Sequence, residues 1–545
     1  MKTKDKGRYR INRKVISGAL IAGLSYLVVG FLWATRLQVW GDEAFSIQII
    51  QLDFAKINQV TAADVHPPLY YYLLKIWADI FGNGELILRL FGLILVAISV
   101  SVMVLIAYRY FSAKVAWITS IIMITSPFAM RLGLEIRMYC LAFLITSLLF
   151  WFYLDYRSGN QTRINLLAVA ILAALSIYTH YYAIFLLIGL AIVEYWDYAR
   201  GFNLRKFWGF VRNSWFFRVG ILTIIFYLPW INVFIGRLIG FNGGFWVPKP
   251  SLFSIFYLPV LFLTNIEEYL MFGWPALAIG FVIFCLIGFN YRKIWKFFVS
   301  TQKKSNSDNI NYNWLLLTRI GLVVTVVMLG ISLVFKTSVF YGRYLSISVF
   351  FTFVFTIAGL IGALLLDRSR RLAVLATGIL LLIGVVYSFV YGNTRLLKEQ
   401  QVTVYQDKSA IECSIDNKNG KDNIYLIDDD SNYLIYDYYL RDILDQDSQF
   451  YLIGDKEKPD INGSAWKRVI NERGAFNYLS KGEIVRSIDF YNNNIWYVSW
   501  NWPRFEDPGA KDSLYRDYRV EQVCQPDARL LTDYDAARAY RLVPK

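Results

Sequence analysis

Long apolar runs constrain this chain more than any other feature of its sequence. The first run covers residues 16–35, and similar runs recur as far as residue 392. Crossing the hydrocarbon core of a bilayer takes about 20 helical residues. The chain is 56% hydrophobic and only 18% charged, with a mean hydropathy of +0.39. A soluble protein of this length could not hide so much apolar surface. The sequence therefore predicts a polytopic α-helical membrane protein.

About eleven of these runs have the length expected of a span. They lie at 16–35, 86–108, 114–128, 138–154, 164–179, 181–196, 219–235, 274–290, 314–335, 345–366 and 372–392. The first is too long for the apolar region of a cleaved signal peptide, and no small-residue cleavage site follows it. Residues 252–264 are also apolar, but a crossing there would invert the charge pattern, so we expect this stretch to lie along the outer surface.

Positive charge sets the predicted orientation. The arm before the first run is rich in Lys and Arg, and so is every second loop of the threading. Because cations collect in cytoplasmic loops, we expect the N-terminus inside the cell and the C-terminus outside a bacterial plasma membrane. The net charge of +15 follows from these loops, so we expect no nucleic-acid partner.

The composition changes after residue 392. We therefore predict a transmembrane domain over 1–392, with a long first outer loop at 36–85, and an extracytoplasmic α/β domain over 393–545. Within the second domain, strand-like segments lie at 423–427, 449–453, 483–490 and 495–500, and a helix-like segment lies at 433–440.

Two side-chain types in this second domain have alternative uses. Cys413 and Cys524 both fall in a compartment that permits a disulfide, although they could also stay reduced. Trp496, Trp500 and Trp502 could stack on sugar rings, but packing in an aromatic core is the more common use of such residues.

Asp42 and Glu43 lie in the sequence Trp-Gly-Asp-Glu directly after the first span. Trp, Tyr, Lys and Arg are the usual residues at a membrane face, because they interact favourably with the headgroup region, and carboxylates gain little interaction energy there. A carboxylate there suits a general base, while the simpler interpretation is a surface acid or a helix cap. In the same loop, apolar spacing predicts interfacial helices over 44–57 and 69–81.

The two histidines and a few cations are the other candidates at the outer face. His66, in the sequence His-Pro-Pro-Leu-Tyr-Tyr, and His180 both fall at predicted outer positions. They could contact a phosphate or a metal, or be structural. Arg137, Lys336 and Arg343 stand among few outer cations. A guanidinium group suits a phosphate, although such side chains also extend to lipid headgroups without further function.

These motifs together resemble the GT-C glycosyltransferases. The matching features are Gly-Asp-Glu after the first span, His-Pro-Pro-Leu-Tyr-Tyr in the first outer loop, Arg-Met-Tyr opening the fourth span and Arg-Tyr-Leu opening the tenth. The branch that is most similar contains protein O-mannosyltransferases and aminoarabinose transferases. The resemblance covers about residues 1–390. It implies an inverting transfer of a hexose or pentose, at the outer face, from a polyprenyl-phosphate-linked donor to a hydroxyl of a cell-envelope glycan, lipid or protein.

The resemblance also implies roles for residues. Asp42 would be the base, and Glu43 would support it or a divalent cation such as Mg²⁺ or Mn²⁺. The expected donor-phosphate residues are His66, Arg343, Arg137 and Lys336; the expected pocket residues are Tyr70, Tyr139, His180 and Tyr344; the metal set would be Asp42, Glu43 and His66. No P-loop or Gly-rich dinucleotide turn is present, so we expect no nucleotide cofactor.

Two other functions remain as alternatives. A transporter or flippase of a polyprenyl-linked glycan could use the same cations to bind phosphate. Transporters place such groups near mid-membrane on broken helices, however, whereas these lie at the predicted outer rim. A non-catalytic scaffold would leave Asp42 and Glu43 without a purpose.

Overall fold

The chain divides into two compact units in a computed structural model. Unit 1 comprises Met1–Ala34 and Arg89–Thr394, and unit 2 comprises Thr35–Leu88 and Arg395–Lys545. The described residues are 10–37, 39–201, 203–239, 247, 249–265, 310–335, 338–364, 413–415, 422–427, 433–434, 437–438, 449–454, 465–472, 478–480, 492–500, 518–524 and 537–545. Residues 35–88, predicted as part of the transmembrane domain, thus belong to the same compact unit as the C-terminal segment.

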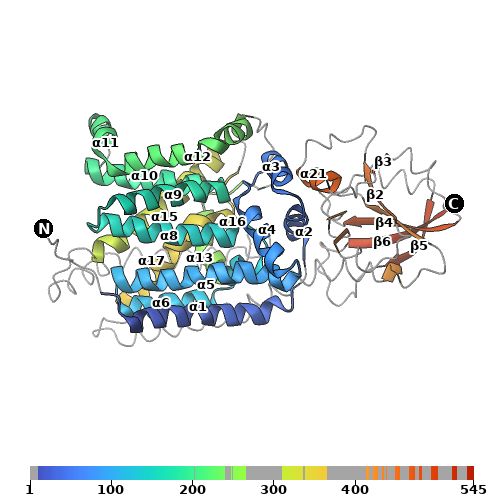
Figure 1. Cartoon of the computed structure of the whole chain (residues 1–545), viewed down its shortest axis with the longest axis horizontal. Helices are drawn as coiled ribbons and strands as arrows, with labels where there is room; N and C mark the ends of the chain where they lie inside the picture. The colour runs from blue at the N-terminus through green and yellow to red at the C-terminus, as the bar shows by residue number, and fades with distance from the viewer. Residues whose placement is uncertain are drawn as a thin grey trace. The chain divides into compact units, whose positions relative to one another are not determined.

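Unit 1 is helical throughout its described residues, and Figure 1 shows its long helices side by side as a bundle. The helices are α1 (Arg13–Ala34), α5 (Glu85–Tyr110, which begins in unit 2), α6 (Ala113–Thr125), α7 (Pro127–Leu134), α8 (Tyr139–Arg157), α9 (Arg163–Thr179), α10 (Ala183–Ala199), η1 (Leu204–Lys206), α11 (Phe207–Asn213), α12 (Trp215–Ile239), α13 (Ser254–Thr264), α15 (Ile310–Val334), α16 (Gly342–Leu345), η3 (Ser346–Phe350) and α17 (Phe351–Leu364).

The helical membrane architecture is confirmed, while the number of eleven spans stays a prediction. Among the described residues, 6 helices are long and apolar enough to cross a membrane, or up to 7 if the bent pair α6 and α7 forms one span. The predicted spans at 274–290 and 372–392 lie outside those residues. Helix α13 has 11 residues, or about 16 Å, which is too short to cross.

Local sequence explains the bend between α6 and α7. Ser126 ends α6 and caps α7, because its hydroxyl accepts a hydrogen bond from the Ala129 backbone N–H at 3.2 Å. Pro127 follows in the first turn of α7, where a missing N–H costs nothing. The two helices therefore meet at 62°, and the predicted span at 114–128 is broken at its end.

Small residues let the helices of unit 1 approach closely. A side chain at Gly189 of α10 would collide with Val324 of α15, and one at Gly321 of α15 would collide with Thr352 of α17. Without a hydrophobic driving force in lipid, such close backbone packing is a main source of helix association.

Unit 2 begins with three short helices, α2 (Gly41–Ile49), α3 (Phe54–Ala63) and α4 (Leu69–Phe81). The helix predicted over 69–81 is confirmed. The single helix predicted over 44–57 is wrong, because the chain turns between α2 and α3. Asp53 caps α3 by accepting a hydrogen bond from the Lys56 backbone N–H at 2.8 Å, and this local bond outweighs the continuing apolar spacing.

The C-terminal part of unit 2 is a mixed α/β domain, as predicted. Its elements are β1 (Asp422–Ile427), β2 (Gln449–Gly454), α21 (Ala465–Glu472), β3 (Tyr478–Ser480), β4 (Asn493–Trp500), β5 (Tyr518–Cys524) and β6 (Ala537–Pro544). The strand order is β3-β2-β1-β4-β6-β5. The first four strands in that order run parallel to one another, whereas β6 pairs antiparallel with both of its neighbours, β4 and β5.

Three of the four predicted strands are confirmed as β1, β2 and β4. The fourth, 483–490, lies outside the described residues, as does half of the predicted helix 433–440. Trp496 is fully buried in β4 and donates a hydrogen bond to the Asn423 side chain at 3.2 Å. Trp496 therefore serves the core of the domain rather than a surface for sugars.

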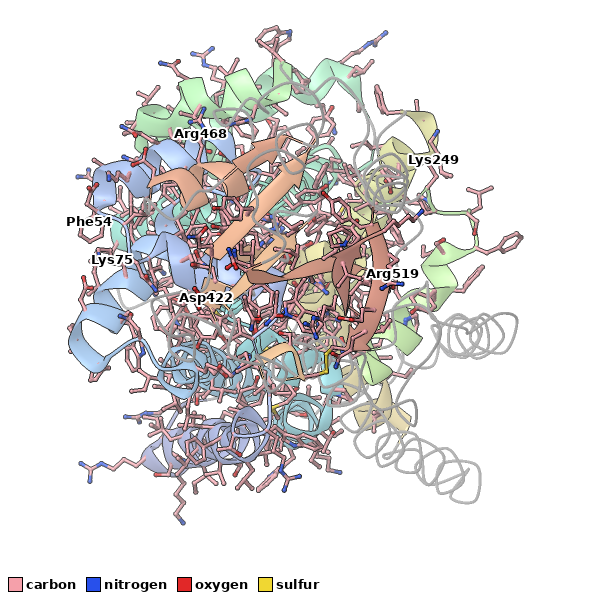
Figure 2. All side chains as sticks on the ribbon, turned by 90° about the vertical axis from the view of Figure 1, so that its right-hand side faces the viewer. Phe54, Lys75, Lys249, Asp422, Arg468 and Arg519 are labelled. Carbon is pink, nitrogen blue, oxygen red and sulfur yellow. A yellow bond between two sulfur atoms is a disulfide. The ribbon has the colours of Figure 1, made fainter. Side chains whose placement is uncertain are left out.

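A disulfide joins Cys413 to Cys524 at the end of β5, the pairing that the sequence allowed. The two residues are 111 positions apart, and their Cα atoms lie 5.7 Å apart. Figure 2 shows the bond in yellow. A cross-link that closes so long a loop stabilises a fold largely by restricting the unfolded chain.

Replacing both cysteines with serine should lower the stability of unit 2 by about 2–4 kcal/mol. This loss of stability should be measurable as faster hydrogen exchange of the backbone amides in β5 and β6. Cys140→Ser, which changes a buried free thiol in unit 1, is the control and should leave these amides unchanged. Equal exchange in wild type and the double variant would contradict the prediction.

Candidate active site

Asp42 and Glu43 lie in the first turn of α2, but their surroundings differ. Glu43 is fully buried, and its carboxylate accepts a hydrogen bond from the Trp40 backbone N–H at 3.4 Å. Glu43 thus helps to close the start of the helix, as the helix-cap interpretation predicted. Asp42 is half-buried and is the more accessible carboxylate of the pair.

His66 is held by a carboxylate that the sequence analysis missed. Its Nδ1 lies 3.1 Å from Oδ2 of Asp64, and both residues are buried. A carboxylate at one ring nitrogen fixes the tautomer and the orientation of an imidazole. The available signal was the acid two positions before the His-Pro-Pro sequence.

Aromatic packing joins the helix that carries Asp42 to the helix that follows His66. Phe45 of α2 meets Tyr71 of α4 edge to face, with ring centroids 6.0 Å apart. Tyr71 in turn packs against Tyr70 at 5.6 Å, and both tyrosines are fully buried. Tyr71 therefore contributes to the packing between α2 and α4, and Tyr70, a predicted pocket residue, packs beside it on α4.

In unit 1, a second group of predicted residues comes together around His180. The His180 ring lies 5.7 Å from Tyr139, 5.4 Å from Tyr182 and 5.3 Å from Tyr344, measured between ring centroids. We call these four residues the His180 cluster. They come from the starts of α8, α10 and α16 and from the end of α9.

The hydrogen bond at His180 assigns its tautomer. Nδ1 accepts a hydrogen bond from the Tyr182 backbone N–H at 3.2 Å, so the proton of the neutral ring lies on Nε2. Nε2 is then a hydrogen-bond donor. A buried donor of this kind can contact a phosphate or a sugar oxygen.

Two of the predicted cations flank the His180 cluster in the chain. Arg343 directly precedes Tyr344 and is half-buried, while Arg137 lies two residues before Tyr139 and is 3% exposed. The π-helical segment η3 follows α16, and such segments are frequent at functional sites. Lys336, the third predicted cation, lies outside the described residues.

Two further arginines near this end of unit 1 have structural partners. Arg131 pairs with Glu135 at 2.5 Å, and Arg89 donates a hydrogen bond to the Leu134 carbonyl at 2.6 Å. Both bonds involve the end of α7, whose last carbonyls have no partner within the helix.

The three side chains proposed to bind a metal do not converge as a ligand set. Within the part of the chain that the structure describes, no three His, Cys, Asp or Glu side chains are placed to hold a metal ion. Glu43 bonds to the Trp40 backbone, and His66 pairs with Asp64. The divalent cation stays a prediction from the sequence, and no step of the proposed transfer requires it.

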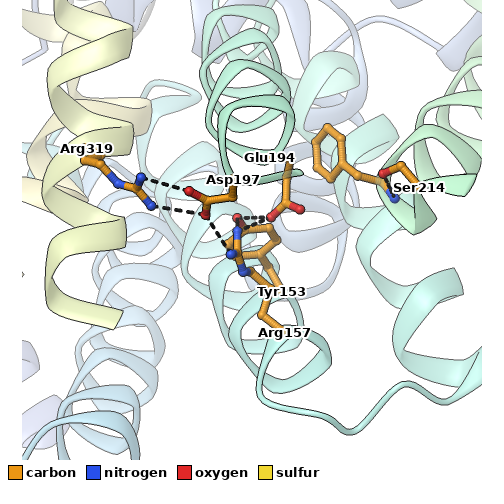
Figure 3. A network of polar contacts seen from close by, with 7 residues as sticks. Tyr153, Arg157, Glu194, Asp197, Ser214 and Arg319 are labelled. Atoms are coloured by element: carbon orange, nitrogen blue, oxygen red, sulfur yellow. Dashed lines mark hydrogen bonds and ion pairs between the residues drawn. The ribbon is translucent and has the colours of Figure 1, made fainter. Parts of the chain in front are cut away.

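A separate polar network lies at the opposite end of α8, as Figure 3 shows. Arg157 of α8 pairs with Glu194 and, at 2.8 Å, with Asp197, both on α10. Arg319 of α15 donates two hydrogen bonds to Asp197, at 2.8 and 3.1 Å. Tyr153 adds a bond to Glu194 at 2.6 Å. Every charge in this network has an opposite partner, which indicates a structural clamp on three helices.

Comparison with known proteins agrees with this architecture. Residues 65–232 match the family model described as dolichyl-phosphate-mannose-protein mannosyltransferase. The matched region begins one residue before His66. No curated protein matches the chain. Among solved structures, ArnT from Cupriavidus metallidurans in the apo state aligns over 96% of this chain and 98% of its own, with 13% identity and a TM-score of 0.56. The same protein bound to undecaprenyl phosphate aligns over the same shares, with 13% identity and a TM-score of 0.54.

At this identity the likeness establishes the fold. The resemblance to the GT-C glycosyltransferases that the motifs indicated is therefore confirmed at the level of architecture. The match to ArnT extends through the C-terminal domain, beyond the 390 residues over which the sequence resemblance was seen.

Removing the Asp197 carboxylate from the network should destabilise unit 1. Asp197→Ala removes the carboxylate that bridges Arg319 and Arg157, although Arg157 keeps its contact with Glu194. Since Asp197 is 19% exposed, we expect a loss of about 2–3 kcal/mol, below the value for a fully buried pair. Thermal unfolding in detergent measures this loss. Arg163→Gln, an exposed charge on α9, is the control and should change stability by less than about 0.5 kcal/mol. Similar melting of both variants would contradict the clamp.

The bond between Asp64 and His66 can be tested by a double-mutant cycle. Asp64→Ala and His66→Ala should each destabilise unit 2, and the double variant should lose less than their sum by about 1–2 kcal/mol, because each single change removes the same charge-assisted bond. Denaturant unfolding of the four proteins gives the coupling energy. Additive losses would show that the two side chains act independently.

Proposed function

We propose that this chain is a GT-C glycosyltransferase that moves a sugar from a polyprenyl-phosphate-linked donor to a hydroxyl acceptor. The observation that carries the proposal is the fold shared with ArnT over 96% of the chain, since that protein binds undecaprenyl phosphate. The match of residues 65–232 to a family of mannosyltransferases supports the same reaction class and the enzyme assignment.

Asp42 is the proposed general base. It accepts the proton of the acceptor hydroxyl while the hydroxyl oxygen attacks the anomeric carbon of the donor sugar. The bond from that carbon to the phosphate oxygen breaks, and the electron pair leaves with the polyprenyl phosphate. A single displacement of this kind inverts the anomeric configuration. The half-buried position of Asp42 supports this role over Glu43, whose carboxylate is used in the helix start.

Fixed cations are proposed to stabilise the leaving group. Negative charge grows on the lipid phosphate as the bond breaks, so cations held beside it lower the energy of the transition state more than that of the ground state. Arg343 and Arg137 are the candidates among the described residues, and Lys336 is a third from the sequence. His66, held in place by Asp64, is proposed to contact the donor phosphate.

The bilayer is proposed to deliver the donor at the outer face of a bacterial plasma membrane. A polyprenyl chain partitions into lipid, so the enzyme needs no soluble nucleotide donor. The acceptor is proposed to be a glycan, lipid or protein of the cell envelope. A transporter of a polyprenyl-linked glycan predicts movement of the lipid without transfer of the sugar, so one experiment separates the two functions.

Asp42→Asn should lower transfer by about 100-fold or more, because it removes the proton acceptor while keeping the shape of the side chain. Membranes with wild type or variant receive radiolabelled polyprenyl-phosphate sugars, and label is followed into lipid, polymer and protein fractions.

The matched control is Asp79→Asn, the same chemical change at an exposed position of the same loop, which should transfer at the wild-type rate. Equal transfer by Asp42→Asn and wild type would remove Asp42 from the mechanism. Lipid movement across the bilayer without transfer of any donor would favour the transporter.

A further inference from the structure

Within unit 2, the helices of the first outer loop contact the C-terminal domain. Helix α21 packs against both α2 and α3. Figure 2 labels Arg468 on α21 and Phe54 and Lys75 on the loop helices. Polar contacts between the described residues of the two segments include Gln48 Nε2 to the Leu434 carbonyl at 2.8 Å, Arg468 Nη1 to the Gln59 carbonyl at 3.2 Å, Tyr438 hydroxyl to Glu85 Oε1 at 3.2 Å, and Lys56 Nζ to Glu472 Oε2 at 3.1 Å.

The Gln48 bond is the one of these contacts that is buried on both sides. Gln48 is 1% exposed and Leu434 is fully buried. The side chains of Lys56 and Glu472 are 42% and 33% exposed, so water and salt screen their attraction and leave it weak. A buried carbonyl that loses its donor is destabilising, because no water replaces the lost partner. Among the contacts named here, the Gln48 bond is therefore the one that water cannot replace.

Gln48 lies on the same short helix as Asp42. Helix α2 has 9 residues, and the two positions are about 9 Å apart along its axis. A helix moves as a rigid rod over this distance, so a shift at Gln48 displaces the Asp42 carboxylate. Phe45, between them, packs against Tyr71 and limits the helix on a second side.

We propose that Gln48 is a positioning residue through which the C-terminal domain sets the location of the Asp42 carboxylate. This inference rests on the proposed function, in which Asp42 is the base. Proton transfer and attack need near-correct geometry, and an error of about 1 Å can cost about 100-fold in rate. The C-terminal domain is then part of the catalytic machinery rather than a separate module that binds the acceptor.

The test uses Gln48→Leu in the full chain, a change that keeps the approximate volume of the side chain and removes its donor. We expect kcat to fall about 10–100-fold, with the KM values for donor and acceptor within about twofold of wild type. Hydrogen exchange of the α2 amides should rise in the same variant. The matched control is Lys56→Met, which breaks the exposed contact with Glu472 and should change neither kcat nor α2 exchange.

If Gln48→Leu fails to fold, Gln48→Asn provides the second variant, because it keeps the amide but withdraws it by one methylene group. It should show the same loss in kcat to a smaller degree.

Three results would overturn the proposal. One is a folded Gln48→Leu protein with wild-type kcat. Another is a raised KM for the acceptor with kcat unchanged, which would assign the domain to acceptor binding. The third is α2 exchange equal to that of wild type. If wild type itself transfers no sugar, the proposed function fails, and the exchange measurement alone still decides whether Gln48 fixes α2.

Discussion

Lipid offers no hydrogen-bond partner to a backbone N–H or carbonyl, and the organisation of unit 1 follows from this constraint. Each segment that crosses the hydrocarbon core must satisfy its backbone internally, which leaves the helix as the available element. Polar chemistry then gathers where helices begin and end. The His180 cluster follows this rule, because its members come from the starts of α8, α10 and α16 and from the end of α9.

Helix α8 shows how the two ends of the bundle divide their roles. Tyr139 at its start belongs to the His180 cluster, whereas Arg157 at its end belongs to the ion-pair network with α10 and α15. The two positions are the first and last of a helix of 19 residues, so about 27 Å separate them. In the network every charge is matched by an opposite charge, which is the signature of a structural role. In the cluster, Tyr139 and Tyr344 lie within two positions of Arg137 and Arg343 in the chain, which supports the proposed role of these arginines at a donor phosphate.

Regular patterns of apolar and aromatic residues were readable from the sequence. Individual side-chain contacts, whether between near or distant residues, were not. Apolar runs gave the helical membrane architecture, and aromatic spacing gave α4 to the residue. Alternation and β-branched residues gave β1, β2 and β4. The three-residue strand β3 was missed, and so were β5 and β6, because an antiparallel pair at one side of a mostly parallel sheet is decided by tertiary packing. The predicted helix over 44–57 failed because one local cap at Asp53 was overlooked. Asp64 was missed since its role depends on a contact with His66, although the two are close in sequence. Of the pocket residues, Tyr139, His180 and Tyr344 were all assigned to the same face, and their meeting around one ring required the fold.

The two parts of unit 2 are separated by about 300 residues of sequence, and this imposes an order on their synthesis. Gln48 and its partner Leu434 are separated by 386 residues. At about 5–20 residues synthesised per second, the loop that carries Asp42 waits about 20–80 seconds for the domain that holds it. During that interval the helices of unit 1 can already be inserted and packed. The nascent protein therefore passes through a stage in which α2 has been synthesised and the backbone carbonyl that Gln48 contacts has not.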